Sequence, residues 1–377
     1  MIKKNDATYF VKSSSFKIII IFAITFILAE LTSKALVKFG FLNSGLPAWV
    51  SLRIHEDYTH WHPKNSSFIL EKKNCWVSKV SYDLNGLRKT SKLKHQIDKK
   101  TIALLGDSMV ENIELSDGED LGSLIQLKLN DYNVLNFGAR GTGLADQLEI
   151  YNKLIKKEKI DYLFLFVTEN DIYNNVNKFT TFYHKRYDFI NGKVVEIQKN
   201  KKYLENYNSL TKKFRRDGIL FLKKLDLYKI YLQFHYYLTI KKSELNKKNN
   251  EIAKDVSSES KFDLNEKKKE IYKYIKKNFD ESLSEDVELF VFLNIRSYMF
   301  ESNKNKKNKQ AAKIMQFIEQ QWKNYPNLYN PLEFSKNILI EKNKFHFPYL
   351  SFTCDGHYSR LGANIISDYV SYVFLNN

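Results

Sequence analysis

Short, near-continuous apolar runs are the clearest pattern along this chain. They span Thr101–Gly106, Tyr132–Gly138 and Ile160–Thr168, and strands buried on both faces of a parallel sheet have this character. Between them, Asp120–Asn130 and Gly143–Lys157 carry apolar residues at helical spacing. This alternation of strand and helix predicts an open α/β sheet.

The same pattern returns near the carboxyl end of the chain. We predict a fourth strand at Val287–Ile295, a helix near residues 310–323 and a weaker fifth strand at Pro348–Thr353. The last helix begins near Ser359, a residue type favoured as an N-cap. The predicted sheet domain therefore covers residues 101–377.

A long segment, about residues 177–286, interrupts this domain. It is rich in Lys, Tyr and Asn and is too long for an ordinary loop. Helical patterns such as Leu220–Leu238 predict an insertion with its own helices, and the charged stretch Lys241–Lys269 is expected to be exposed.

Residues 43–100 precede the sheet domain and are irregular in pattern. Pro47, Pro63 and Asn85-Gly86 mark turns, and Trp76–Leu84 is a short β-like piece. We interpret this segment as a stalk and lead-in.

The amino-terminal residues combine positive charge with an apolar run. Ile18–Ala29 is uncharged and is preceded by four lysines, Lys3, Lys4, Lys12 and Lys17, as in a secretion or membrane-insertion signal. The run is shorter than the roughly 20 residues of a membrane span, but the residues that follow it supply the length. Three interpretations stay open: an uncleaved anchor, a cleaved signal with Ser33-Lys34-Ala35 as its site, and a buried helix.

We favour the anchor. Residues 1–42 are then a cytoplasmic tail and a single-pass transmembrane signal-anchor in the cytoplasmic (inner) membrane. The rest of the chain is expected to be periplasmic or otherwise extracytoplasmic.

Charge and cysteine content narrow the classes of partner. The formal charge is +17, but only 8 of the 60 basic residues are Arg. Arg is the residue that base readout and phosphate binding favour. We therefore expect a solvated basic surface and no nucleic acid partner.

Cys75 and Cys354 are the only cysteines. Two cysteines exclude a disulfide framework or a cysteine metal cluster, and they leave open a single disulfide bridge.

Four polar segments follow predicted strands or precede the last helix, where open α/β sheets form their sites. They are Gly106–Ser108, Asn136–Gly143, Thr168–Asp171 and Cys354–Gly362. Turns, helix caps or surface pairs explain each one alone. Together they supply a nucleophile, oxyanion donors and a base with its acid, which are the groups that acyl transfer requires.

In these blocks and their order, the chain resembles the SGNH or GDSL-type hydrolases. The resemblance covers Thr101–Asp171 and Asp355 to the carboxyl terminus, and leaves the insertion unmatched. It implies a three-layer α/β/α flavodoxin-like parallel sheet and an esterase or acyltransferase site that needs no metal and no cofactor. Tyr82–Thr90 is similar to a segment of membrane-tethered bacterial members.

The resemblance also implies roles for particular residues. Ser108 is the nucleophile, His357 the base and Asp355 its partner. The oxyanion hole is implied to consist of the backbone N–H groups of Ser108 and Gly141 and the side chain of Asn170.

Two positions depart from the family pattern. Thr168 stands where the family usually has Gly, and Asp355 and His357 are separated by one residue where two are commoner. The shorter spacing also occurs in members tied to envelope polysaccharide acylation. The remaining histidines, such as His60 and His62, are interpreted as surface residues.

Three functions follow as hypotheses. The first is hydrolysis of an acyl ester, an O-acetyl or lipid ester, outside the cytoplasmic membrane. The second is O-acyl transfer to an envelope polysaccharide, and the third is a non-catalytic envelope protein that binds through its Lys-rich insertion. The four blocks favour an enzyme, since a binding module needs no base.

Overall fold

The computed structural model describes part of the chain, in two units. The described residues are 5–38, 53–54, 60–72, 74–90, 96, 98–176, 184–197, 231, 263–296, 299, 306–341, 350–352 and 354–377. One unit comprises Met1–Leu46 and Asn206–Val256, and the other comprises Pro47–Glu205 and Ser257–Asn377.

The first unit contains helix α1, Asn5–Lys38. Within it, Lys17–Ala35 has a mean hydropathy of 2.0 and is long and apolar enough to cross a membrane. Only 11% of this window is buried, whereas the core helix of a soluble protein is mostly buried. A signal sequence has the same length and composition, so the helix itself does not distinguish an anchor from a cleaved signal.

The second unit is built on a five-stranded parallel sheet, in the order β11-β10-β7-β5-β6. Its strands are β5 (Thr101–Leu105), β6 (Asn133–Asn136), β7 (Tyr162–Val167), β10 (Glu288–Leu293) and β11 (Leu328–Tyr329). In chain order this is the 2-1-3-4-5 arrangement of flavodoxin-like sheets. The predicted fold class is confirmed, and four of its strands lie where the apolar runs predicted them.

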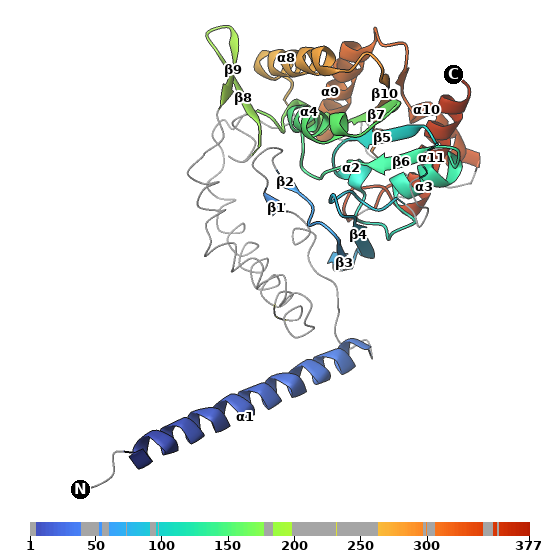
Figure 1. Cartoon of the computed structure of the whole chain (residues 1–377). Coiled ribbons are helices and arrows are strands. Elements are labelled where there is room, and N and C mark those ends of the chain that lie inside the picture. The colour runs from blue at the N-terminus through green and yellow to red at the C-terminus, as the bar shows by residue number, and fades with distance from the viewer. Residues whose placement is uncertain are drawn as a thin grey trace. The chain divides into compact units, whose positions relative to one another are not determined.

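Helices cover both faces of the sheet and complete three layers (Figure 1). One face is covered by α4 (Leu144–Lys153), α8 (Glu266–Ser282) and α9 (Lys306–Trp322). The other is covered by α3 (Leu121–Lys128), α10 (Leu332–Glu341) and α11 (Arg360–Leu375). Alternate strand residues serve the two cores: Ala103 and Leu105 face the first, and Ile102 and Leu104 the second.

The start of α11 fixes the segment that precedes it. Ser359 is the N-cap, as predicted, and its hydroxyl accepts a hydrogen bond from the N–H of Gly362 at 3.1 Å. A Cβ at Gly362 would lie 1.9 Å from the carbonyl oxygen of Leu350, so only glycine permits this close approach. The loop before the helix is therefore held against it.

The predicted fifth strand at Pro348–Thr353 is wrong in the part that the structure describes. Ser351 forms only an isolated antiparallel bridge with Tyr358, and the fifth strand of the sheet is β11. Leu350 is fully buried in the second core, so the apolar residues here reflect packing beneath α11. A two-residue strand such as β11 is too short to show a period.

The predicted insertion is described at its two ends. It begins with an antiparallel hairpin of β8 (Arg186–Ile190) and β9 (Lys193–Ile197), which the sequence analysis missed. The turn is Asn191-Gly192, with φ of 50° and 78°, the sequence that two-residue hairpins prefer. Helix α8 lies at the other end, and the predicted helical piece Leu220–Leu238 lies outside the described residues apart from Tyr231.

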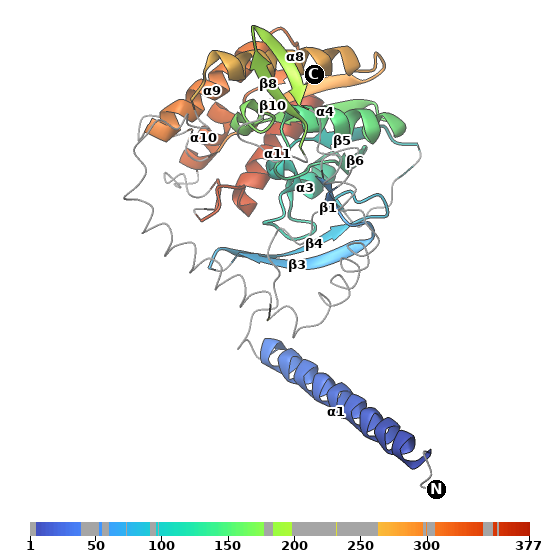
Figure 2. The same ribbon diagram turned by 90° about the vertical axis from the view of Figure 1, so that its left-hand side faces the viewer.

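A second hairpin comes from the segment before the sheet. β3 (Ser66–Lys72) and β4 (Trp76–Tyr82) pair antiparallel, and a shorter pair joins β1 (Arg53–Ile54) to β2 (His60–Trp61). Leu70, Val80 and Tyr82 are fully buried, so the hairpin of β3 and β4 packs into the second unit. It lies on the side of this unit away from α8 (Figure 2).

Candidate active site

Ser108 lies just beyond the carboxyl end of β5, at the point where the strand order of the sheet reverses. The next strand, β6, is on one side of β5 and β7 is on the other, which is where open α/β sheets bind their ligands. Ser108 opens helix α2, Ser108–Glu111, whose N-cap Asp107 accepts the N–H of Met109 at 2.9 Å. The N–H of Ser108 belongs to the first turn, which has no intrahelical acceptor.

The structure brings the three predicted catalytic side chains together. The Ser108 hydroxyl lies 2.8 Å from Nε2 of His357, although 249 positions separate them. On the other side of the ring, Nδ1 of His357 lies 2.5 Å from Oδ1 of Asp355. Gly356, with φ of 83°, makes the turn that lets both neighbours reach each other across a one-residue spacing.

The turn after β6 leaves Gly141 as a free backbone donor. Oxygen acceptors already take the N–H groups of its neighbours in the turn, Phe137, Gly138, Ala139, Arg140, Thr142 and Gly143. Within the described part of the chain, the N–H of Gly141 has no such acceptor. Its φ of 75° lies in the region that favours glycine.

Gly138 is the other candidate in this turn, and its surroundings exclude it. Its N–H donates to Oδ1 of Asn136 at 2.8 Å. A Cβ at Gly138 would lie 2.3 Å from the backbone nitrogen of Glu111. Gly138 is thus required for close packing of the turn on α2, whereas Gly141 is available to a ligand.

Asn170 lies beyond the end of β7, in the short 3₁₀ helix η3 (Glu169–Ile172). Its Nδ2 donates to Oδ2 of Asp107 at 2.8 Å, and its Oδ1 contacts the hydroxyl of Thr168. An amide nitrogen carries two hydrogens, so one remains for a ligand. Thr168 is fully buried and is the N-cap of η3.

Comparison with known proteins gives weak likenesses. No protein-family model and no curated protein matches the chain. Among solved structures, a lipase/acylhydrolase from Enterococcus faecalis is 11% identical, with a TM-score of 0.37 over 74% of this chain and 96% of that one. A lipolytic protein of the G-D-S-L family from Veillonella parvula is 10% identical, with a TM-score of 0.39 over 74% and 100%. At such values their activities do not carry over to this chain.

The strand order of the sheet, and the meeting of the four polar segments at one edge of it, are seen directly in the structure of this chain. The sheet has the flavodoxin-like strand order, and the segments that carry the sequence resemblance to the SGNH-type hydrolases lie together at its edge. In this arrangement, Asp355 accepts a hydrogen bond from the Nδ1–H of His357, which leaves Nε2 to accept one from the Ser108 hydroxyl. Burial by itself would raise the pKa of Asp355, but hydrogen bonds from His357, Trp76 and Lys72 hold it well below its usual range.

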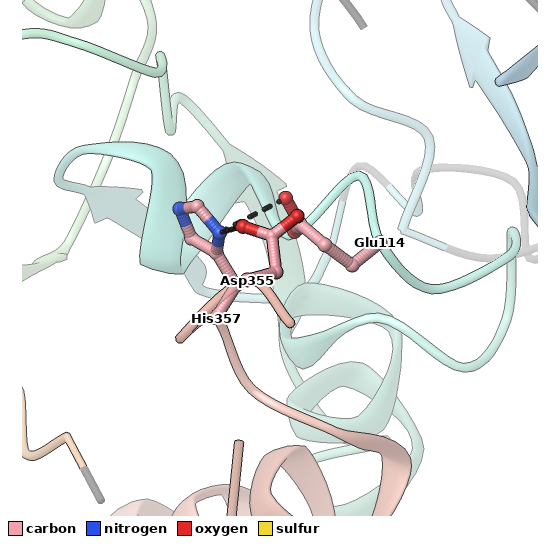
Figure 3. Close-up of side chains that lie close together, drawn as sticks. All are labelled: Glu114, Asp355 and His357. Atoms are coloured by element: carbon pink, nitrogen blue, oxygen red, sulfur yellow. Dashed lines mark hydrogen bonds and ion pairs between the residues drawn. The ribbon is translucent and has the colours of Figure 1, made fainter. Parts of the chain in front are cut away.

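Glu114 adds a second carboxylate to this candidate site, and the sequence analysis missed it. Its Oε1 lies 3.2 Å from Nδ1 of His357 (Figure 3), and its side chain is 4% exposed. Burial raises the pKa of Glu114, against the opposing charge of His357. Burial lowers the pKa of His357, but Glu114 and then Asp355 raise it above its ordinary value overall.

Glu114, Asp355 and His357 also have the composition of a metal site, since one ligand atom from each lies within 4.8 Å of the others. Here Nδ1 of His357 is the atom shared by both carboxylates, and a ring nitrogen that carries a proton does not bind a metal ion. Lys72 lies 3.1 Å from Asp355 and already neutralises its charge. The contacts of Nδ1 thus suit a shared proton better than a metal ion.

A buried ionic network lies behind the site and was also missed. Glu111 accepts from the backbone N–H of Arg140 at 2.9 Å and from its guanidinium at 2.6 and 3.0 Å. The Tyr82 hydroxyl donates to it at 2.8 Å, and Nε2 of His62 lies 3.0 Å away. Burial alone would raise the pKa of Glu111, but the charges of Arg140 and His62 hold it well below its usual range.

The interpretation of His62 as a surface residue is wrong. It is 3% exposed, its Nδ1 lies 2.9 Å from the carbonyl oxygen of Gly86, and its ring stacks on Tyr82. The sequence pattern before the sheet is irregular, and no local signal in it shows that this segment packs against the residues behind α2. The side chain of His60 lies outside the described residues.

Proposed function

We propose that the protein is a serine ester hydrolase of the SGNH type that cleaves an acyl ester. The observation that carries this proposal is the continuous chain of hydrogen bonds from Ser108 through His357 to Asp355. The unpaired donors at the same edge of the sheet support it, because they suit an oxyanion.

In the acylation step, Oγ of Ser108 attacks the ester carbonyl carbon while Nε2 of His357 takes the hydroxyl proton. The carbonyl electron pair moves to oxygen, and the N–H groups of Ser108 and Gly141 and Nδ2 of Asn170 stabilise the oxyanion. When the tetrahedral intermediate collapses, the bond to the alcohol oxygen breaks and that oxygen takes the proton from Nε2. The acyl group is then an ester of Ser108.

Deacylation repeats the sequence with water. His357 takes a proton from the water, whose oxygen attacks the acyl carbon, and Ser108 leaves with the proton returned from Nε2. Throughout, the protonated imidazole is stabilised by Asp355 at 2.5 Å and by Glu114 at 3.2 Å. The chain's own groups supply every proton transfer in this scheme.

The acyl acceptor separates hydrolysis from transfer. We propose water as the acceptor and an O-acetyl or lipid ester of the cell envelope as the substrate; a sugar hydroxyl in place of water would make the protein an O-acyltransferase. Mass spectrometry of envelope glycans and lipids from cells with and without active protein tests this. Loss of ester content with the active protein supports hydrolysis, and a gain of glycan ester content contradicts it.

We propose that α1 anchors the protein in the cytoplasmic membrane and that the sheet domain lies outside it. The disulfide between Cys75 and Cys354, with Cα atoms 5.8 Å apart, supports this location, because disulfides persist in oxidising compartments. Protease added to intact spheroplasts is expected to digest the sheet domain. Protection of that domain until the membrane is lysed would contradict the proposed orientation.

Hydrolysis of an aryl acetate by the purified protein tests the activity itself. Ser108→Ala is expected to reduce the rate to background, because no other group provides the nucleophile. Ser67→Ala is the matched control, since Ser67 is exposed and lies on β3. Equal rates for Ser108→Ala and the wild-type protein would contradict the proposal.

A further inference from the structure

The second oxygen of the Asp355 carboxylate is held by two residues from far upstream. The indole N–H of Trp76 donates to Oδ2 at 2.7 Å, across 279 positions. Lys72 Nζ lies 3.1 Å from the same oxygen and donates to the carbonyl oxygen of Cys354 at 2.6 Å. With Oδ1 bound to His357, both oxygens of Asp355 have partners.

Trp76 and Lys72 belong together on the hairpin of β3 and β4. They are direct cross-strand partners, so their side chains lie on the same face of the hairpin. The body of the hairpin is fixed by Leu70 and Val80, which are fully buried. The pair is thus presented to Asp355 from a packed element.

A disulfide joins the hairpin to the Asp355 loop at the same place. Cys75 directly precedes Trp76, Cys354 directly precedes Asp355, and the two cysteines are bonded. Three kinds of interaction, covalent, ionic and hydrogen-bonding, therefore meet within two residues of Asp355. A loop with so many restraints from one element has little freedom to turn its carboxylate away.

Resting on the proposed function, we propose that Trp76 and Lys72 are positioning residues of the esterase, which keep the Asp355 carboxylate aimed at Nδ1 of His357. Hydrogen bonds to a carboxylate are stronger than those between neutral groups. Trp offers one donor and no acceptor, and Lys offers a charge, so neither competes for the imidazole proton. The hairpin, though outside the sheet, completes the active site.

The electrostatics of Asp355 agree with this arrangement. Burial would raise its pKa, and His357, Trp76 and Lys72 outweigh burial. An ionised Asp355 is the form that stabilises the protonated imidazole of His357 during acylation.

Trp76→Phe and Lys72→Met test the proposal, each alone and combined with Asp355→Asn. Alone, each is expected to lower kcat by about 10-fold to 100-fold, as for loss of a hydrogen bond to a charged group, with KM little changed. In the Asp355→Asn background, neither should lower kcat further, because both act through Asp355. Full additivity in that background, or single variants with wild-type kcat, would overturn the proposal.

Matched controls come from the opposite face of β4. Lys79→Met removes an exposed lysine and Val77→Ala trims a side chain that is 62% exposed, and both are expected to keep wild-type kcat. Lys72→Arg is expected to restore most of the activity lost in Lys72→Met. The lysine is 42% exposed, so its variants test the proposal even if Trp76→Phe fails to fold.

A second readout does not need activity. Titration of the Asp355 carboxyl by carbon NMR is expected to show a higher pKa in Trp76→Phe and Lys72→Met than in the wild-type protein, and no change in Lys79→Met. An unchanged Asp355 pKa would overturn the positioning role. An inactive wild-type protein in which the pKa still shifts would instead contradict the proposed function and leave the positioning contacts standing.

Discussion

Glu111 holds Arg140 twice, through the guanidinium at 2.6 and 3.0 Å and through the backbone N–H at 2.9 Å. Arg140 directly precedes Gly141, and Glu111 ends the helix that Ser108 begins. This contact therefore ties the turn with the proposed oxyanion donor to the helix with the proposed nucleophile. A shift of either would separate groups that must act on one carbonyl.

Arg140→Ala is expected to impair both stability and rate. It leaves Glu111 buried with fewer partners, and removal of one member of a buried pair costs about 3–5 kcal/mol of unfolding free energy. Because the turn loses the guanidinium contacts with Glu111 and keeps only the backbone one, we also expect kcat to fall by about 10-fold. Arg360→Ala, on a side chain that is 71% exposed, is the control for thermal denaturation and kinetics, and equal effects of the two changes would contradict this role.

Gly141→Ala tests the oxyanion turn. A side chain at a φ of 75° costs about 1–3 kcal/mol of backbone strain, and relief of that strain turns the N–H away, so we expect kcat to fall by about 10²-fold. Gly192→Ala is the matched control, because Gly192 has a φ of 78° and nothing within 4 Å of an added Cβ. We expect both variants to lose similar stability and only Gly141→Ala to lose kcat. A wild-type kcat in Gly141→Ala would exclude the Gly141 N–H as an oxyanion donor.

The sheet was predictable from sequence because each central strand carries its own signal. Buried parallel strands such as β5 and β7 are apolar throughout, and the polar residues that follow them mark the edge at which a site forms. Ser108, His357 and Asp355 could be predicted to lie close together for this reason and from the order of the blocks, and the structure brings them together. The two-residue strand β11 has no periodic pattern, and its position depends on pairing with β10.

The surroundings of the site were not predictable in the same way. Glu114, Trp76 and Lys72 reach the proposed catalytic groups through tertiary contacts that leave no local pattern. A buried glutamate is identical in sequence to an exposed one, and the hairpin of β3 and β4 alternates like any half-buried pair of strands. Only the path of the chain shows that Cys75 and Cys354 meet.

Glu114→Gln is expected to move the pH profile. His357 must be neutral to act as a base, and its pKa is raised because Glu114 and Asp355 outweigh burial. The rise of kcat/KM with pH should therefore have its midpoint above about 6.5, the ordinary value for histidine. Removal of the Glu114 charge lowers the pKa of His357, so the midpoint should move to lower pH; Glu119→Gln is the control, and an unmoved midpoint in Glu114→Gln would contradict the assignment.

The disulfide is expected to contribute to stability. Native bridges typically contribute about 2–4 kcal/mol, so Cys75→Ser with Cys354→Ser should lower the melting temperature by about 3–7 °C for a domain of this size. Reductant should destabilise the wild-type protein and leave the double variant unaffected, as measured by calorimetry. Equal melting temperatures for oxidised and reduced wild-type protein would contradict the bond.

Covalent labelling of Ser108 tests the central claim most directly. A fluorophosphonate reacts with a serine whose hydroxyl is activated by a neighbouring base, and the adduct is located by mass spectrometry of peptides. The predicted result is one adduct, on Ser108, that forms about 10²–10⁴ times more slowly in His357→Ala. Labelling of a different serine, or labelling of Ser108 at the same rate in His357→Ala, would contradict the account.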